Sequence, residues 1–259
     1  MDLAELLKVA EAAVDRGRVI AARAPGELTS KGDRDMASEV DFAVEREVRA
    51  FLTRETPDIG VLGEEEGGAT DGTRWVLDPI DGTVNFVHGL PLWGISLGLI
   101  HEGRAVAGVI DHPALGTRYA AAEGLGSTCN GKAIRGSRCT ELTDALVAVG
   151  DYAVGPNAAE QNIRRLALTG RLHPRVQRIR MIGTAATALT WTAAGHFDAM
   201  IMFSNKPWDT MAGVAIAREA GVRVLDLDGS EHTPDSIGTV AVAAGIADPV
   251  LELITAATG

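Results

Sequence analysis

The segment WVLDPIDGT at residues 75–83 places two aspartates, Asp78 and Asp81, directly after a short apolar run. The apolar run predicts a buried strand, and Pro79 and Gly82 let the chain turn tightly where that strand ends. Carboxylates and backbone carbonyls are the hard oxygen ligands that Mg²⁺ selects. The segment therefore predicts a metal site at a strand end, although a solvent-exposed Asp-Gly turn has the same letters.

Further acids stand in comparable settings elsewhere in the chain. Glu64 and Glu65 follow a second apolar run, residues 59–62, and Asp209 follows a tryptophan just before a predicted helix. Asp41 lies on an amphipathic stretch that precedes the glutamates. Considered singly, Asp209 is typical of a helix cap or first-turn carboxylate and Asp41 of an exposed helix charge. Only their combination with residues 75–83 favours a shared site.

Together these segments resemble the inositol monophosphatase family, which consists of Mg²⁺-dependent, lithium-sensitive phosphomonoesterases. The motifs that carry the resemblance are spread over essentially the whole chain: residues 63–65, 75–83 with 85–86, 183–186, and 208–209 with 212–213. The resemblance implies a phosphoric monoester hydrolase with the layered α-β-α-β-α fold of this family. It also places the site between two halves of one compact catalytic unit.

The order of predicted elements fits such a two-part chain. Residues 1–143 are predicted to form an α+β half that carries most of the metal ligands, and residues 144–259 an α/β half that carries Asp209 and the leaving-group side. The predicted helices span residues 2–23, 38–53, 158–168, 184–194 and 211–220, with a last helix from 249. The predicted strands span 59–62, 75–77, 95–100, 105–110, 118–122, 146–149, 197–202, 222–227 and 239–243, of which 95–122 form an antiparallel meander.

The resemblance implies a set of oxygen ligands for two to three Mg²⁺ ions. Glu64, Asp78 and the carbonyl of Ile80 would hold the first ion. Asp78, Asp81 and Asp209 would hold the second, so that Asp78 bridges the two. A third and looser ion would share Glu64.

The same resemblance implies how water and phosphate are handled. Thr83, oriented by Asp41, would help a coordinated water to become the nucleophile, and Glu64 would act on the same water. Glu65 would orient coordinated waters from behind the ligands. The backbone amides of Gly82 and Thr83 can point at a phosphate where the chain enters a short helix.

The leaving-group side is less specified by the sequence. Gly183, Thr184 and Ala185 would present backbone amides and small side chains to the leaving group. Inositol-specific members carry a glutamate seven residues before the aspartate of the tryptophan motif, and this chain has Met202 there. A thioether is a poor hydrogen-bond acceptor for ring hydroxyls, unless Met202 is only the buried end of a strand. Lys206 is either a cation for a second anionic group or a solvated loop lysine.

We therefore expect hydrolysis of a small polar phosphate monoester. The substrate is an inositol phosphate, or alternatively fructose bisphosphate, histidinol phosphate or a phosphate of specialised metabolism. A regulatory macromolecule-binding protein on the same scaffold is the alternative from another class, although such a protein would be expected to lose at least one ligand.

Composition agrees with a globular cytoplasmic enzyme. The 259 residues are 46% hydrophobic, carry a formal charge of −11, and contain no apolar run of the roughly 20 residues that span a bilayer. The negative charge argues against a nucleic-acid partner, and bound divalent cations would reconcile it with an anionic substrate. Cys129 and Cys139 are expected to be free thiols. A homodimer is expected from the resemblance, with no membrane partner.

Overall fold

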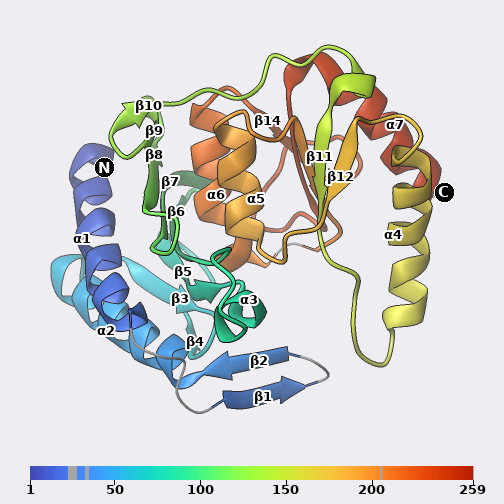
Figure 1. The fold of residues 1–259 in the computed structure, drawn as a ribbon. Helices are drawn as coiled ribbons and strands as arrows, with labels where there is room; N and C mark the ends of the chain where they lie inside the picture. The colour runs from blue at the N-terminus through green and yellow to red at the C-terminus, as the bar shows by residue number, and fades with distance from the viewer. Residues whose placement is uncertain (23–27, 33–34, 205, 259) are drawn as a thin grey trace.

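A computed structural model describes residues 1–22, 28–32, 35–204 and 206–258, and its elements form five layers in the order α-β-α-β-α (Figure 1). This arrangement confirms the predicted fold class. The outer face of a large sheet is covered by α1 (Leu3–Ala21) and α2 (Glu39–Glu55). Between the two sheets lie α5 (Ala185–Ala193) and α6 (Pro207–Glu219). The outer face of a small sheet is covered by α4 (Ala158–Leu172) and α7 (Ala247–Thr258). The predicted end of the first helix, residue 23, lies outside the described residues.

The large sheet contains eight strands in the order β10-β9-β8-β7-β6-β5-β3-β4. Its strands pair antiparallel except for β3 and β5, which are parallel neighbours. The predicted meander is confirmed as β6–β8. The strands are β3 (Gly60–Gly63), β4 (Gly67–Gly68), β5 (Arg74–Asp81), β6 (Gly94–His101), β7 (Arg104–His112), β8 (Thr117–Ala122), β9 (Gly126–Cys129) and β10 (Lys132–Ala133). A short helix, α3 (Thr83–Val87), follows β5, and a separate hairpin pairs β1 (Leu28–Gly32) with β2 (Asp35–Ser38).

The small sheet contains five strands in the order β12-β11-β13-β15-β14. Strand β11 runs parallel to both of its neighbours, whereas β15 is antiparallel to β13 and β14. The predicted alternation of strands and helices is therefore present, with antiparallel pairs added on one side. The strands are β11 (Leu146–Val149), β12 (Arg178–Arg180), β13 (Ala199–Met202), β14 (Arg223–Leu225) and β15 (Thr239–Val242), and two 3₁₀ turns lie at Leu142–Asp144 and Ala244–Ile246.

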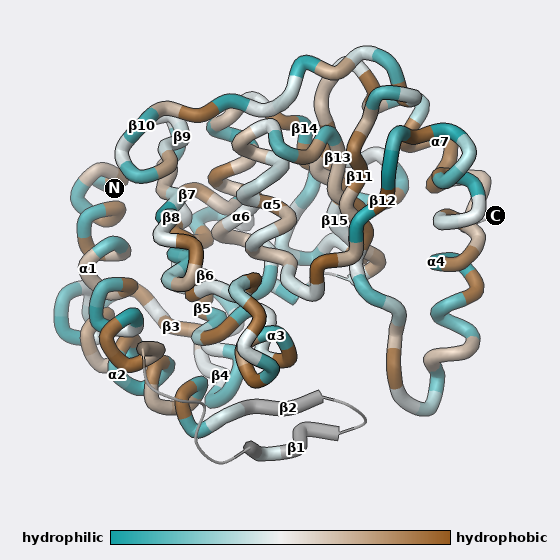
Figure 2. Tube along the Cα trace, viewed as in Figure 1, coloured by the Kyte–Doolittle hydropathy of each residue, from teal (hydrophilic) through white to brown (hydrophobic). Residues whose placement is uncertain are grey.

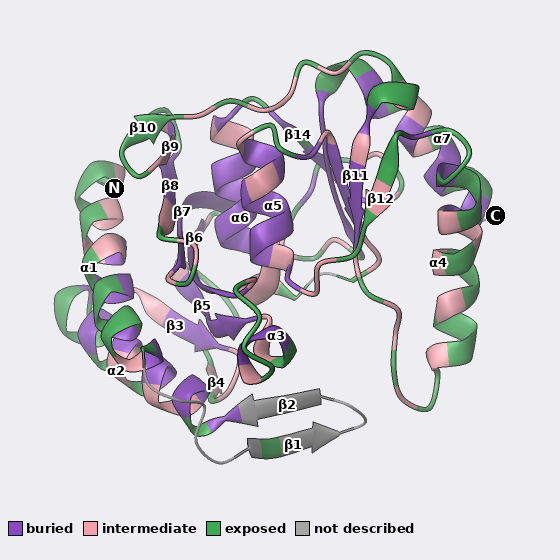
Figure 3. Ribbon diagram, viewed as in Figure 1, coloured by how far each residue is buried: buried purple, intermediate pink, exposed green. Residues whose placement is uncertain are grey.

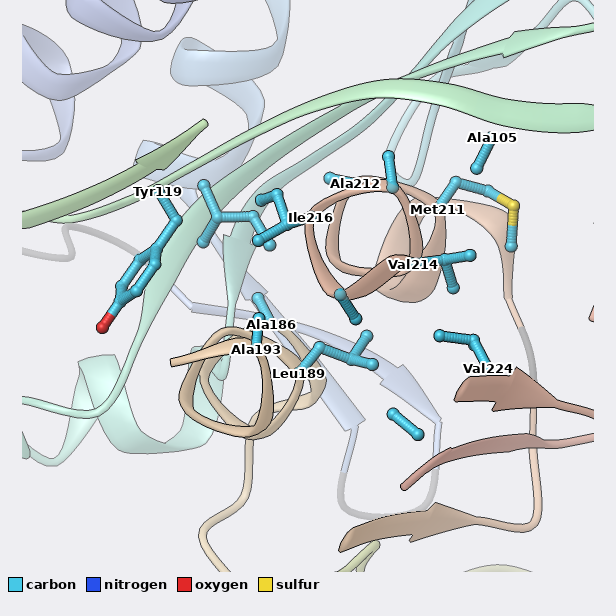
Figure 4. Close-up of a cluster of buried hydrophobic side chains, with 14 of the residues drawn as sticks. Ala105, Tyr119, Ala186, Leu189, Ala193, Met211, Ala212, Val214, Ile216 and Val224 are labelled. Carbon is cyan, nitrogen blue, oxygen red and sulfur yellow. The ribbon is translucent and has the colours of Figure 1, made fainter. Parts of the chain in front are cut away.

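The middle helices form the most deeply buried layer. Figure 3 shows α5 and α6 almost wholly buried, whereas α4 is largely exposed or intermediate. Figure 4 shows their small and branched side chains packed between the sheets. Helix α6 lies very close to the large sheet because β6 and β7 carry glycines there. A Cβ on Gly98 would lie 2.7 Å from the backbone nitrogen of Ala212, and one on Gly108 would overlap the Ala212 backbone. This close packing fixes α6 against the large sheet at Ala212.

The outer helices follow the predicted amphipathic pattern, with hydrophilic and hydrophobic residues alternating along α1, α2 and α4 (Figure 2). In α1 the buried residues are Ala10, Ala13, Val14, Gly17 and Ala21, which recur at helical spacing. Among the described residues, no helix combines the length and the apolarity that crossing a membrane requires. Because α5 and α6 pack against both sheets, residues 1–143 and 144–259 share one central core layer.

Candidate metal and phosphate site

Three carboxylates from distant parts of the sequence meet at one point. Glu64 follows β3, Asp78 lies on β5, and Asp209 lies in the first turn of α6. One ligand oxygen of each lies within 4.8 Å of the others. Because β3 and β5 are parallel neighbours, with Gly63 opposite Leu77, their carboxyl ends reach the same edge of the sheet. The fold therefore brings together three of the predicted metal ligands.

The acid cluster is electrostatically unfavourable without a cation. Asp78 is only 3% exposed. Burial, followed by the charges of Glu64, Asp81, Asp209 and Asp41, raises the pKa of Asp78 well above its usual value. Hard oxygen donors gathered at this density match the ligand set of Mg²⁺ or Ca²⁺, and a bound divalent ion reverses the local repulsion. These residues therefore fit a metal site.

Asp81 connects the end of β5 with the start of α5. Its carboxylate accepts hydrogen bonds from the backbone N–H groups of Ala185 (3.2 Å) and Ala186 (3.0 Å) and from the Thr184 hydroxyl. Burial raises the pKa of Asp81 to about 6, although these three hydrogen bonds oppose the increase. The amide of Ala185, expected to face the leaving group, thus donates to Asp81 in this structure, as does the amide of Ala186. Their contact with a substrate stays a prediction.

Thr83 and Asp41 lie in direct contact behind the acid cluster. The Thr83 hydroxyl donates to Asp41 Oδ1 (3.3 Å) and to the carbonyl oxygen of Ile80 (3.1 Å). The other oxygen of Asp41 accepts from the backbone N–H of Ser38 (2.9 Å), which completes a capping box at the start of α2. Asp41 is 1% exposed, so the interpretation of this residue alone as an exposed helix charge is wrong. Gly82 turns the chain into α3 with a φ of +91°, a conformation that favours glycine.

Glu45 and Arg49 on α2 form an ion pair that was not predicted from the sequence. This pair holds the segment that carries Glu64. The side chain of Glu45 is fully buried and accepts from the backbone N–H groups of Glu65 (2.8 Å) and Glu66 (2.9 Å). Arg49 forms an ion pair with Glu45 at 2.9 Å and also donates to carbonyls on both sides of the β3–β4 turn. A Cβ on Gly63 would overlap the Glu45 carboxylate. In the sequence these residues have the i,i+4 spacing of an ordinary exposed pair, so no signal distinguished them.

A cavity of about 550 Å³ opens above the acids. Asp41 and Glu65 are not part of its lining, which agrees with roles behind the ligands. Lys206 lies at the edge of the cavity and is exposed, with its ammonium 5.8 Å from the centre of the Trp208 ring. The predicted site residues that line the cavity are Glu64, Asp78, Ile80, Asp81, Gly82, Thr83, Gly183, Thr184, Ala185, Met202, Lys206 and Asp209.

A carboxylate cluster at the edge of one sheet, closed by helix starts from the other half, is the site of a metal-dependent enzyme that acts on an anion. Comparison with known proteins then identifies the family. The model of the inositol monophosphatase family matches residues 2–257. The chain belongs to this family of metal-dependent phosphatases and is a phosphoric monoester hydrolase.

Individual relatives agree with this assignment. A protein of Mycobacterium tuberculosis named probable inositol 1-monophosphatase ImpA is 37% identical over 257 residues, covering 97% of this chain and 94% of the relative. The fructose-1,6-bisphosphatase/inositol-1-monophosphatase of Thermotoga maritima is 36% identical over 205 residues, covering 77% of this chain and 75% of the relative. The extragenic suppressor protein suhB of Bartonella henselae has a crystal structure that matches with a TM-score of 0.89 at 28% identity, covering 96% and 98% of the two chains.

Proposed function

We propose that this chain hydrolyses a small polar phosphate monoester in a reaction that requires Mg²⁺. The observation that carries the proposal is the convergence of Glu64, Asp78 and Asp209 within 4.8 Å. Asp81 and the carbonyl of Ile80 line the same cavity and extend the set of oxygen donors. An anionic substrate would approach such a cluster only if cations neutralised it.

In this proposal Glu64, Asp78 and the Ile80 carbonyl would hold one Mg²⁺, and Asp78, Asp81 and Asp209 would hold a second. Glu64 would also contribute to a third site. When bound, Mg²⁺ neutralises charge on the phosphate oxygens and makes water a stronger acid. The Thr83 hydroxyl donates to the carbonyl oxygen of Ile80 (3.1 Å), and this contact, which orients the carbonyl, supports the proposed role.

The remaining chemistry belongs to side chains of the chain itself. Thr83 holds its proton toward Asp41 and Ile80, so the lone pairs of its hydroxyl oxygen can accept a hydrogen bond from the attacking water. Asp41 is fixed by the capping box and keeps Thr83 in this orientation. Glu64 accepts a proton from the same water, and Glu65 orients coordinated waters. The backbone amides of Gly82 and Thr83 bind the phosphate, and Gly183, Thr184 and Ala185 face the leaving group.

The substrate is not fixed by the family. Met202 lines the cavity at the position where inositol-specific members have a glutamate, so one acceptor for ring hydroxyls is missing. Fructose bisphosphate, histidinol phosphate and a phosphate of specialised metabolism therefore remain candidates beside inositol phosphates. The Thermotoga relative, whose name includes both a fructose-bisphosphatase and an inositol monophosphatase, supports a range of substrates within the family.

Phosphate release from a panel of inositol, sugar, histidinol and nucleoside phosphates tests this proposal. With Mg²⁺ present, at least one monoester should be turned over, and lithium should suppress the reaction. Absence of turnover across the panel, with a folded protein that binds a partner macromolecule instead, would favour the regulatory alternative. We also propose that the chain acts as a cytoplasmic homodimer, which sedimentation analysis of the purified protein would test.

A further inference from the structure

The wall of the cavity opposite the acids differs in chemistry from the metal side. It is formed by the segment after β11, by α4 and by the end of β13. The apolar and aromatic side chains of this wall surround a single arginine: Val149, Tyr152, Val154, Met202 and Phe203 stand around Arg165. The polar residues Asp151, Gln161 and Ser204 line the same wall. A leaving group that extends from the phosphate toward this wall therefore meets an apolar surface that contains one arginine, together with a few hydrogen-bonding groups.

Arg165 is held in place without a neutralising partner. Its guanidinium donates to the carbonyl of Gln161 (3.1 Å) and lies 5.7 Å from the centre of the Phe203 ring. No carboxylate of the described residues lies within ion-pair distance of Arg165, although Asp151 lines the same wall. Burial lowers the pKa of Arg165, as expected for a cation partly removed from water and not compensated by an acid.

Three other partly buried arginines, Arg49, Arg118 and Arg218, form ion pairs, whereas Arg74, like Arg165, donates to a backbone carbonyl and has no carboxylate partner among the described residues. Arg49 forms an ion pair with Glu45 at 2.9 Å, and Arg118 forms ion pairs with Asp15 and Asp111 at 2.6 and 2.9 Å. A partly desolvated guanidinium gains most from an anion that it can contact with two parallel hydrogen bonds. Arg165 lines the cavity above the acids, so this cavity gives an anionic group of a bound substrate access to the guanidinium.

We propose that Arg165 anchors a second anion subsite, and that the preferred substrate is a phosphate monoester whose leaving group has an apolar face and a second negative charge. The apolar face would cover Met202 and Phe203, and the second anion, a carboxylate or another phosphate, would bind the guanidinium. This inference rests on the proposed function and sharpens its substrate class.

Three aryl phosphates that share one ring test the subsite: phenyl phosphate, 4-carboxyphenyl phosphate and 1,4-phenylene bisphosphate. The measured quantity is the ratio of kcat/KM for each charged probe to kcat/KM for phenyl phosphate. Comparing this ratio between wild type and variants cancels differences in leaving-group reactivity. In Arg165→Gln the ratio should fall about 10- to 100-fold, the loss expected for charge-assisted hydrogen bonds. Whichever charged probe loses more identifies the preferred anion.

Arg164→Gln is the matched control, because Arg164 is the neighbouring residue on α4 and is exposed. The control should leave the ratio unchanged, and Arg165→Lys should restore part of it because the charge remains while the planar fork is lost. An unchanged ratio in Arg165→Gln, or an equal fall in Arg164→Gln, would overturn the subsite. Failure of the wild type to hydrolyse any monoester with Mg²⁺ would instead overturn the proposed function. Wild-type hydrolysis of myo-inositol 1-phosphate in preference to both charged probes would overturn the subsite while the phosphatase assignment stands.

Discussion

Replacing Glu45 by glutamine should destabilise the protein and weaken its hold on Mg²⁺. The Glu45 carboxylate is fully buried, accepts two backbone N–H groups and pairs with Arg49, whose side chain is 25% exposed. A glutamine at this position keeps the volume of the side chain but removes its negative charge. Its amide N–H group would also face the backbone and guanidinium N–H groups that donate to the carboxylate. Breaking one partner of a buried ion pair costs about 3–5 kcal/mol, and the partial exposure of Arg49 favours the lower end, ~3 kcal/mol.

Glu47→Gln provides the matched control on the same helix. Glu47 pairs with Arg16 at 3.1 Å, but both side chains are largely exposed, at 41% and 47%. Exposed pairs contribute roughly 0–1 kcal/mol, so this control should remain close to wild type. The free energy of unfolding from urea denaturation, measured without Mg²⁺, distinguishes the two variants.

A second measurement connects Glu45 with the site. Because its hydrogen bonds hold the turn that follows Glu64, Glu45→Gln should raise the Mg²⁺ concentration needed for half-maximal activity by about tenfold or more. Binding of Mn²⁺ followed by electron paramagnetic resonance reports the same loss without turnover. If Glu45→Gln differs from Glu47→Gln by less than ~1 kcal/mol in unfolding, the claim that this pair braces the metal-binding turn is wrong.

Four further substitutions test other parts of the structure. Asp209→Asn, like Asp81→Asn, should abolish phosphate release while circular dichroism shows an intact fold; full activity of either variant would refute its assignment as a ligand. Met202→Glu should raise activity toward inositol phosphates relative to other monoesters, and an unchanged or lower ratio in the panel assay would count against the role of this position. Burial lowers the pKa of His232 from about 6.5 to about 4. As the pH falls through this range, the unfolded chain takes up a proton at this histidine before the native state does. The native state therefore loses stability between about pH 6.5 and pH 4. His232→Gln should remove up to ~3 kcal/mol of this acid destabilisation in urea titrations at pH 7 and pH 4, and identical pH dependence in both proteins would contradict it.

The sequence predicted which strands and helices carry the site better than it predicted the residues at which these elements end. The apolar run Trp75–Leu77 was expected to be the strand, with a tight turn at Pro79 and Gly82 directly after it. In the structure β5 continues to Asp81, and its pairing with β6 shifts register between Asp78 and Asp81. A bulge tolerates proline and changes the direction of neighbouring side chains, and both aspartates, which are predicted metal ligands, line the cavity. A hydrophobic pattern carries no information about such a shift.

Polar contacts between distant segments could not be predicted from local patterns. Glu45 has the surroundings of an exposed helix residue in the sequence, and only the folded chain brings it under the turn at Glu65. Strand β12, residues Arg178–Arg180, was missed for a related reason: two of its three residues are exposed arginines, and pairing with β11 defines it. The requirement for glycine at Gly98 and Gly108 likewise follows only from the close contact with α6.

The two halves of the protein are joined at Asp81, a predicted metal ligand, as well as by the core. An ionised carboxylate can accept about four hydrogen bonds, and Asp81 uses three of these positions for donors at the start of α5. One position therefore remains for a cation, so Asp81 can bind Mg²⁺ without releasing α5. Asn85 makes a second connection between the two halves. Its side-chain amide donates to the carbonyls of Leu92 (2.7 Å) and Ile182 (2.9 Å). Residues 182–186 are thus positioned by Asp81 and Asn85. Under the proposed assignment, a cation bound at Asp81 would stabilise both sides of the cavity at once.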